Sequence, residues 1–241
     1  MKYFGLSDQG KTRTSNQDSF IVVKNPASNI LAVVCDGIGG AKNGDWASNL
    51  VVQKLGEAFQ ETGTFTSYEI CRKWLRTQLN RVNEEIYQKS LLSADCRGMG
   101  TTVVALIIHK NGVAIVNCGD SRCYQLQGEH LIQITRDHTI VSALVAKGAL
   151  SKKEAIEHPK RHILSRAVGA ESKTKFDFYN LTNQVETLLL CSDGLFGLVE
   201  DEDIERVVKK DCSCEKKAKE LLEIANNNGG YDNITVVLLE R

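Results

Sequence analysis

The chain has 241 residues, 42% of them hydrophobic, which suits one large domain or two small ones with an ample core and indicates no disorder. Thirty basic residues balance thirty acidic ones, so no overall field would attract the protein to nucleic acid or to an anionic membrane surface. The N-terminus lacks the apolar core of a signal peptide and no run approaches membrane-spanning length, so we expect a soluble, cytoplasmic protein without membrane insertion.

The first half of the chain contains two amphipathic helices that follow short strands. Apolar runs at residues 20–23 and 30–35 predict two buried strands. In residues 45–62 and 67–93 the apolar side chains fall on one face of a helix, so each helix has one face to bury. The period then changes. Short strands are predicted at residues 101–109, 113–117, 122–127 and 131–134, and the intervening turn sequences indicate an antiparallel meander.

The second half begins with polar, helix-prone sequence between residues 137 and 166, which predicts an excursion outside the core. Helix pairs separated by strand runs indicate an α+β fold, in which two antiparallel sheets pack together beneath outer helices. No repeat or linker interrupts the chain, so we expect one domain over residues 1–241. The remaining elements are strands at residues 175–179, 187–191 and 233–239 and helices at residues 200–210 and 215–226.

Four apolar runs have an aspartate at one tip. Asp36, Asp120 and Asp193 follow such runs, and Asp232 precedes the last one. The ends of buried strands gather at the rim of a sheet, where several carboxylates would repel one another. Divalent cations take oxygen ligands and supply the missing positive charge. The pattern therefore predicts metal-assisted chemistry.

Two local features add to this prediction. Gly37 follows Asp36, and a glycine lets a ligand approach the backbone closely, so a cation could take both the carboxylate and a carbonyl. An isolated Asp-Gly pair is more often a plain turn. Arg13 lies five residues before Asp18, and its guanidinium could clamp a phosphate bidentately while the acid faces the cations. Alone, such a pair is usually solvated and of little consequence.

Seven short motifs together contain the acids and Arg13 described above. They are Arg13-x-x-Asn16-Gln17-Asp18, Asp36-Gly-x-Gly-Gly40, Gly100-Thr-Thr102, Asn117-x-Gly-Asp-Ser-Arg122, Asp137-His-Thr139, Cys191-Ser-Asp-Gly194 and Gly230-x-Asp-Asn-Ile-Thr235. In this order and spacing they resemble protein phosphatase type 2C, a family of metal-dependent serine/threonine phosphatases, and especially its compact bacterial members, over nearly the whole chain. The resemblance implies a β-sandwich flanked by helix pairs, with a flap subdomain at about residues 142–162.

The resemblance also implies a role for each main site residue. Asp36 would bridge two ions, Mn²⁺ or Mg²⁺, and the Gly37 carbonyl would bind one of them. Asp193 and Asp232 would complete the second, which makes these three aspartates the catalytic set. Arg13 would grip the phosphate. Two such cations lower the pKa of a bridging water, whose hydroxide attacks phosphorus.

Two further acids and three departures from the family pattern concern the periphery of this site. The resemblance implies that Asp18 acts from the outer shell and that Asp120, with Asp193, holds a weaker third ion. Ile38 stands where many relatives carry a histidine proposed as general acid, and Ala41 where bacterial relatives often have one. Water would then protonate the leaving alkoxide. Gln17 replaces a glutamate of some relatives, which removes one charge.

Other polar residues and the cysteines have plainer interpretations. We expect His138 to cap or brace a turn rather than to catalyse. Arg122 could bind substrate, or could pair with Asp120 or a backbone carbonyl. The eight cysteines are interpreted as reduced and mostly structural, and Cys212-Ser-Cys214 lacks partners with zinc-ligand spacing. No Cys-x₅-Arg loop of a cysteine phosphatase is present.

The main functional hypothesis is hydrolysis of phosphoserine and phosphothreonine on proteins. The expected partners are phosphorylated proteins and a cognate Ser/Thr protein kinase, and the expected state is a monomer. A rival hypothesis is a phosphoprotein-docking module that has kept the fold, but such a module would be expected to have lost a metal-site acid. A phosphatase specialised for one regulatory protein is the second alternative.

Overall fold

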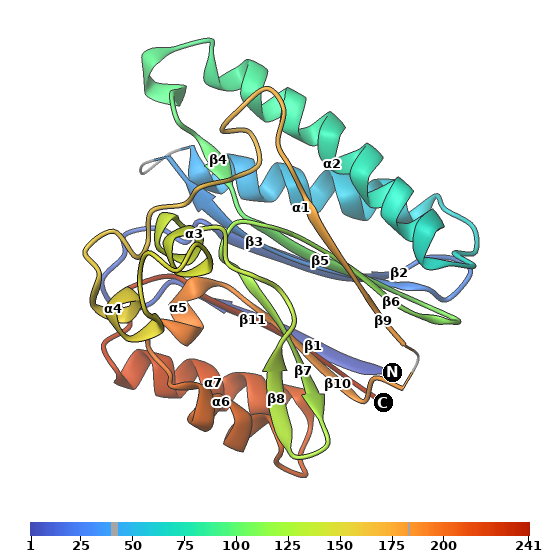
Figure 1. The fold of residues 1–241 in the computed structure, drawn as a ribbon. Helices are drawn as coiled ribbons and strands as arrows, with labels where there is room; N and C mark the ends of the chain where they lie inside the picture. Colours follow the sequence, from blue (N-terminus) through green and yellow to red (C-terminus); the bar gives the residue numbers. More distant parts are fainter. Residues whose placement is uncertain (40–42, 183) are drawn as a thin grey trace.

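Two antiparallel sheets pack face to face in the computed structural model, which describes residues 1–39, 43–182 and 184–241 (Figure 1). The predicted α+β sandwich is therefore confirmed. In the first sheet the strand order is β1 (Lys2–Asp8), β11 (Ile234–Glu240), β10 (Thr187–Cys191), β7 (Arg122–Gln127) and β8 (His130–Gln133). In the second it is β2 (Asp18–Lys24), β3 (Ile30–Ile38), β5 (Val103–His109), β6 (Gly112–Cys118) and β9 (Asp177–Leu181), with β4 (Gly100–Thr101) on the end of β3.

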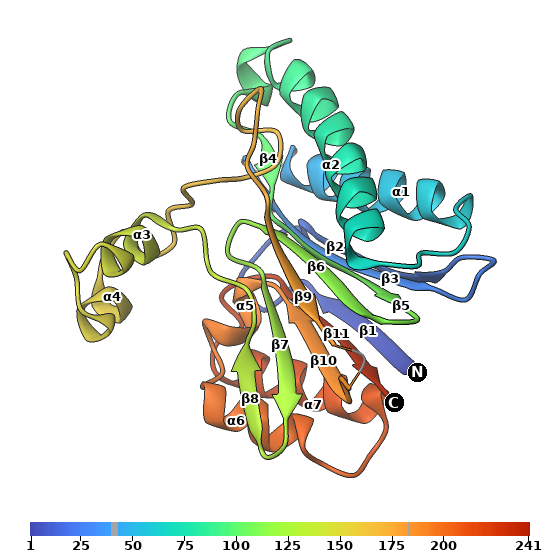
Figure 2. The same cartoon turned by 45° about the vertical axis from the view of Figure 1, so that its right-hand side comes forward.

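Helices cover the outer face of each sheet, so that three apolar layers are buried (Figures 1 and 2). The helices α1 (Gly44–Gln60) and α2 (Tyr68–Ser90), followed by the short 3₁₀ turn η1 (Ala94–Cys96), lie on the second sheet. The first sheet is covered by α5 (Asp193–Phe196), α6 (Asp201–Val208) and α7 (Cys214–Asn227). The side chains between the two sheets are almost entirely Val, Ile, Leu and Ala, as expected for strands buried on both faces.

The predicted meander over residues 101–134 was wrong. The hairpin β5–β6 belongs to one sheet and the hairpin β7–β8 to the other, because β6 pairs with β9 and β7 pairs with β10. The chain therefore crosses between the sheets at residues 119–121. This crossing places Asp120 at the junction of the two sheets.

The first strand was not predicted from the sequence. Strand β1 pairs with β11 along its whole length, from Lys2 opposite Glu240 to Asp8 opposite Ile234, so the two ends of the chain meet in one sheet. Gly5 interrupts its apolar pattern. A Cβ at this position would overlap the ring of Phe20, so the glycine makes room for an aromatic side chain of the other sheet.

The polar excursion forms two short helices that stand apart from the sandwich in Figure 2. They are α3 (Ile140–Ala146) and α4 (Lys152–Glu157), and the segment is closed by an antiparallel bridge between Thr139 and Leu164. Over the described ranges, the structure contains no helix that is both long and apolar enough to cross a bilayer.

Candidate functional site

Asp18 and Asp36 face each other across the β2–β3 pair, where they are in direct register. The Asp18 side chain is 8% exposed, and its Oδ2 accepts a 2.6 Å hydrogen bond from the Ser192 hydroxyl. The Oδ1 atom of Asp18 is buried and has no hydrogen-bond partner among the described residues. A carboxylate buried with an unpaired oxygen needs a compensating positive charge.

Asp193 and Asp232 come from the neighbouring strands of the other sheet. Asp193 is the first residue of α5, two residues after the end of β10, and Asp232 lies two residues before β11. Gly194 allows the two segments to touch, because a Cβ there would overlap the carbonyl oxygen of Asn233. Within the described part of the chain, Asp193 Oδ1 is a second buried oxygen without a partner.

Asp120 reaches the same place from the crossing between the sheets and is 7% exposed. The turn before it is held by His138, whose Nδ1 accepts a 3.1 Å hydrogen bond from the Gly119 N–H. On its other side, His138 Nε2 lies 3.0 Å from Asp177 Oδ2. His138 thus has a structural role, as expected from the sequence, but it braces the distant turn at Gly119, whereas the helix that follows is capped by Thr139.

The electrostatics of these acids are unfavourable without a cation. Burial raises the pKa of Asp18 to about 7, and the charges of Asp193 and Asp232 add to this effect. Burial and neighbouring carboxylates also hold the pKa values of Asp36 and Asp120 well above the ordinary aspartate value. The pKa of Asp193 is raised in the same way, first by burial and then by Asp232. Asp18, Asp36, Asp120 and Asp193 therefore resist ionisation until positive charge is supplied.

A cavity of about 400 Å³ lies between the sheets, and all of the sequence-predicted site residues except Asp18 line it. Asp18 is buried and does not line it. Arg13 stands at the cavity mouth, where its side chain is 52% exposed and its Nη2 forms a 2.6 Å ion pair with Asp232 Oδ2. This hydrogen bond raises the pKa of Arg13. The predicted phosphate-binding residue is thus present but engages a carboxylate. The lining residues predicted from the sequence are Arg13, Asp36, Gly37, Asp120, Asp193 and Asp232.

The donor set fits hard divalent cations. Carboxylate oxygens surround the cavity, and two of the five acids carry buried oxygens without partners. Among the described residues, no three His, Cys, Asp or Glu side chains form a complete direct ligand set for one ion. Backbone carbonyl and water would have to supply the remaining ligands, which is usual for Mg²⁺.

Several residues that hold the site were not assigned roles from the sequence. The Thr102 hydroxyl accepts from the Asp36 N–H at 2.9 Å and lies 2.6 Å from the Ser121 hydroxyl. Asn233 accepts from the Gln17 N–H and donates to two carbonyl oxygens of the segment 9–15, at 2.9 Å in each case. Thr102 and Asn233 both belong to motifs quoted above. Their place in these motifs was the signal from which a role at the site could have been predicted.

The excursion also contributes to the cavity wall. His162 and Leu164 line it, although they lie more than forty residues from Asp120 in the sequence. The charge of His162 acts to lower the pKa of Asp193. No sequence pattern links these residues to the strand tips. The expectation for Ala41 falls outside the described residues, whereas Ile38 lines the cavity.

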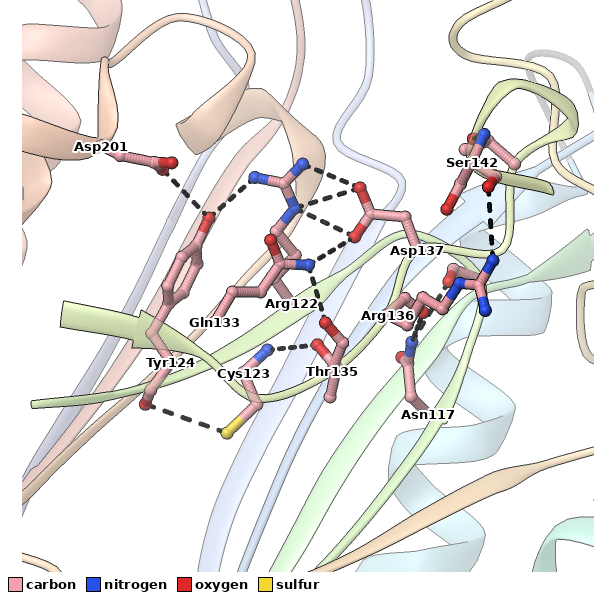
Figure 3. A network of polar contacts seen from close by, with 12 residues as sticks. Asn117, Arg122, Cys123, Tyr124, Gln133, Thr135, Arg136, Asp137, Ser142 and Asp201 are labelled. Carbon is pink, nitrogen blue, oxygen red and sulfur yellow. Dashed lines mark hydrogen bonds and ion pairs between the residues drawn. The ribbon is translucent and has the colours of Figure 1, made fainter. Parts of the chain in front are cut away.

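Among the described residues Arg122 pairs with Asp137, and not with Asp120 or a backbone carbonyl as the sequence suggested. Figure 3 shows its guanidinium facing Asp137, with Nε and Nη2 at 3.0 and 2.7 Å from the carboxylate oxygens. Its Nη1 donates to the Tyr124 hydroxyl at 2.8 Å. The Cζ atom of the guanidinium lies over the ring of Phe196, 3.5 Å from its centroid. Asp137 opens the excursion, so Arg122 fixes the start of that segment.

Comparison with known proteins identifies close relatives over the whole chain. A family model described as protein phosphatase 2C matches residues 9–238. The serine/threonine phosphatase stp of Listeria welshimeri is 41% identical over 236 residues, covering 98% of this chain and 94% of the relative. Protein phosphatase PhpP of Streptococcus pneumoniae is 36% identical over 235 residues, covering 97% and 95%.

Solved structures agree with these sequence matches. The serine/threonine phosphatase Stp1 from Staphylococcus aureus superposes with a TM-score of 0.94 at 32% identity, covering 100% of this chain and 94% of the other. The serine/threonine phosphatase PstP/Ppp of Mycobacterium tuberculosis gives a TM-score of 0.86 at 33% identity, covering 100% and 99%. The likeness therefore covers the whole length of the chain.

Proposed function

Because the chain belongs to the protein phosphatase 2C family of hydrolases, we propose that it removes phosphate from phosphoserine and phosphothreonine of proteins at the cavity between its sheets. One observation carries the proposal. Acids from both sheets are buried around one cavity with pKa values raised by burial and mutual repulsion, and an arginine stands at its mouth. Such an arrangement is costly unless cations and a phosphate dianion occupy it.

The cofactors proposed are two Mn²⁺ or Mg²⁺ ions and a weaker third. Bound there, they would supply Lewis acidity that activates water and offsets the charge on the phosphate. Asp36, at the centre of the acids, would be shared between the two ions. The other proposed ligands are the Gly37 carbonyl, Asp193 and Asp232, with Asp18 acting through water and Asp120 serving the third ion with Asp193.

Arg13 would bind the phosphate oxygens bidentately. In the structure the Arg13 guanidinium is 2.6 Å from the Asp232 carboxylate. A cation bound to Asp232 and a phosphate bound to Arg13 would therefore both compete with this ion pair. Ile38 lines the cavity and carries no transferable proton. We propose that water supplies the proton taken up by the leaving alkoxide.

The proposed partners are phosphorylated proteins, among them the products of a cognate Ser/Thr kinase, and the proposed state is a monomer in the cytoplasm. The docking-module alternative remains the second candidate because it needs only the fold. The complete set of acids favours the enzyme.

The test is turnover of p-nitrophenyl phosphate and of a phosphothreonine peptide by the purified protein with Mn²⁺ or Mg²⁺. We expect chelation to stop both reactions, and Asp36→Asn or Asp193→Asn to reduce kcat by about a hundredfold or more, since each removes charge that stabilises the transition state. Asp211→Asn, on an exposed acid outside the cavity, is the matched control. Turnover in excess chelator, or unchanged turnover in both variants, would refute the mechanism. Metal-dependent peptide binding without turnover would establish the docking module.

A further inference from the structure

A second hollow of about 340 Å³ adjoins the site cavity. Ile38 and Leu164 line both, so these two apolar side chains separate them. A protein chain whose phosphorylated residue entered the first cavity would extend past this partition. Its neighbouring residues on one side would then lie in the second hollow.

The wall of the second hollow is a loop held firmly to the sandwich. Val168 and Thr101 exchange backbone hydrogen bonds of 2.8 and 3.0 Å. Asn83, buried on α2, accepts a 2.8 Å hydrogen bond from the Gly169 N–H and donates to the Glu171 carbonyl at 3.0 Å. A loop held in this way loses little conformational entropy when it binds a ligand.

The loop presents uncompensated positive charge to the hollow. Lys173 and Lys175 line it and are exposed, and neither forms an ion pair with any described residue. Arg166 also lines it, but its Nη1 is 2.9 Å from Asp177 Oδ1, so its charge is balanced. Glu171 is the acid that lines the same hollow. Two free ammonium groups therefore face one carboxylate, beside a site that takes a phosphorylated residue.

We propose that this hollow, defined by Glu171, Lys173 and Lys175 and called the basic subsite, binds acidic side chains on one side of the phosphorylated residue. The enzyme would accordingly prefer acidic phosphopeptides, with the preference confined to that side. Exposed ion pairs are weak, so the preference should be about two- to fivefold per acidic residue and should shrink at high salt. The inference rests on the proposed function.

The test compares phosphothreonine peptides that carry a single Glu, Ala or Lys at each position from about four residues before to four residues after the phosphothreonine, a span within reach of an extended chain. We expect kcat/KM to favour Glu over Ala, and Ala over Lys, at positions on one side only. The small substrate p-nitrophenyl phosphate has no flanking residues and reports the phosphate site alone. Repeating the series in about 0.5 M NaCl should flatten the preference.

Variants then assign the preference to the subsite. The pair Lys173→Ala and Lys175→Ala should bring the Glu-to-Ala ratio close to one, the pair Lys173→Glu and Lys175→Glu should invert it, and Glu171→Gln should increase it. Lys110→Ala, on an exposed lysine in the β5–β6 turn, should leave it unchanged. A wild-type enzyme that hydrolyses p-nitrophenyl phosphate but shows no acidic preference would overturn this inference, as would a preference that survives both double variants. A wild-type protein inactive on every substrate would overturn the proposed function, and this inference with it.

Discussion

Gly37 lies where two backbone segments cross without space for a side chain. A Cβ at this position would overlap the carbonyl group of Gly44, the first residue of α1, and would lie 2.8 Å from the Gln17 carbonyl oxygen. The glycine was interpreted from the sequence as room for a metal ligand. The structure supplies a second reason for it, because the entry to α1 packs directly against the end of β3.

We expect Gly37→Ala to lower the free energy of unfolding by about 3 kcal/mol or more, the cost of forcing a methyl group against fixed backbone. Urea denaturation of chelator-treated protein measures this effect apart from any loss of metal affinity. The matched control is Gly63→Ala, because nothing lies within 4 Å of its added Cβ, and this change should stay within about 0.5 kcal/mol. Equal stability of the two variants would contradict the packing argument.

For individual residues, the sequence predicted the site aspartates but not the side chains that hydrogen-bond or pair with the site residues. Aspartates at the tips of apolar runs could be recognised because strand ends share an edge. The ion pair between Arg13 and Asp232 joins residues more than two hundred positions apart, and the contact between Thr102 and Ser121 joins two separate strand ends. Only the pairing of the strands brings such groups together, and no local pattern encodes it.

At the scale of secondary-structure elements, the two hairpins could be predicted from the sequence, but the sheet to which each hairpin belongs could not. The turns after β5 and β7 follow from Gly112 and Gly128, which both have positive φ. The sheet that each hairpin joins is decided by β9 and β10, which come about sixty residues later in the chain. Strand β1 was missed for a similar reason, since its partner β11 is the last strand.

His138 connects three segments of the chain at the start of the excursion that contains α3 and α4. Besides the contacts of its ring with Gly119 and Asp177, its backbone carbonyl accepts a 2.8 Å hydrogen bond from the Ser165 N–H. The Gly119 N–H requires an unprotonated Nδ1, so the proton sits on Nε2 and donates to Asp177. Burial lowers the pKa of His138 further, which keeps the ring neutral.

We expect His138→Ala to cost about 2–4 kcal/mol of stability, because it leaves the buried Gly119 N–H unpaired and opens a void. His138→Asn keeps an acceptor near the Nδ1 position and should recover part of this loss. Chemical denaturation of the three proteins at pH 7.5 gives the comparison, with the exposed His130→Ala as control. If His138→Ala unfolds at the same urea concentration as wild type, the brace contributes nothing.

At the scale of the whole molecule, the site acids come from both sheets and meet where the sheets adjoin. Asp18 and Asp36 belong to β2 and β3, Asp193 and Asp232 flank β10 and β11, and Asp120 lies where the chain crosses. Their mutual repulsion therefore acts across the interface of the sandwich, beside its apolar interior. Cations bound among them would hold the sheets together, so the proposed catalytic centre should also contribute to the stability of the fold.

This arrangement gives a pH dependence whose sign can be stated. The folded pKa of Asp18 is about 7, and those of Asp36, Asp120 and Asp193 are also raised above the model-peptide value of 3.8. Between about pH 4 and 7 the metal-free folded protein thus binds more protons than the unfolded chain, and its stability must fall as pH rises through that window. His109 and His138, whose pKa values burial lowers, act in the opposite sense within this window, but among the described residues they are two groups against four.

We therefore expect the free energy of unfolding of chelator-treated protein to increase by on the order of 2 kcal/mol when the pH is lowered from 7.5 to 5.5. Excess Mg²⁺ or Mn²⁺ at pH 7.5 should add about 2.7 kcal/mol at one hundred times Kd and should reverse the pH trend, because protons then compete with the cation.

The variant Asp36→Asn separates repulsion among the acids from stabilisation by the cation. Without its charge, the metal-free variant should be more stable than wild type at pH 7.5 and should gain little from added cation. Urea denaturation of wild type and Asp36→Asn across this pH range, with and without metal, measures these free energies of unfolding. A metal-free wild type that loses stability on acidification would show that the buried acids do not oppose folding.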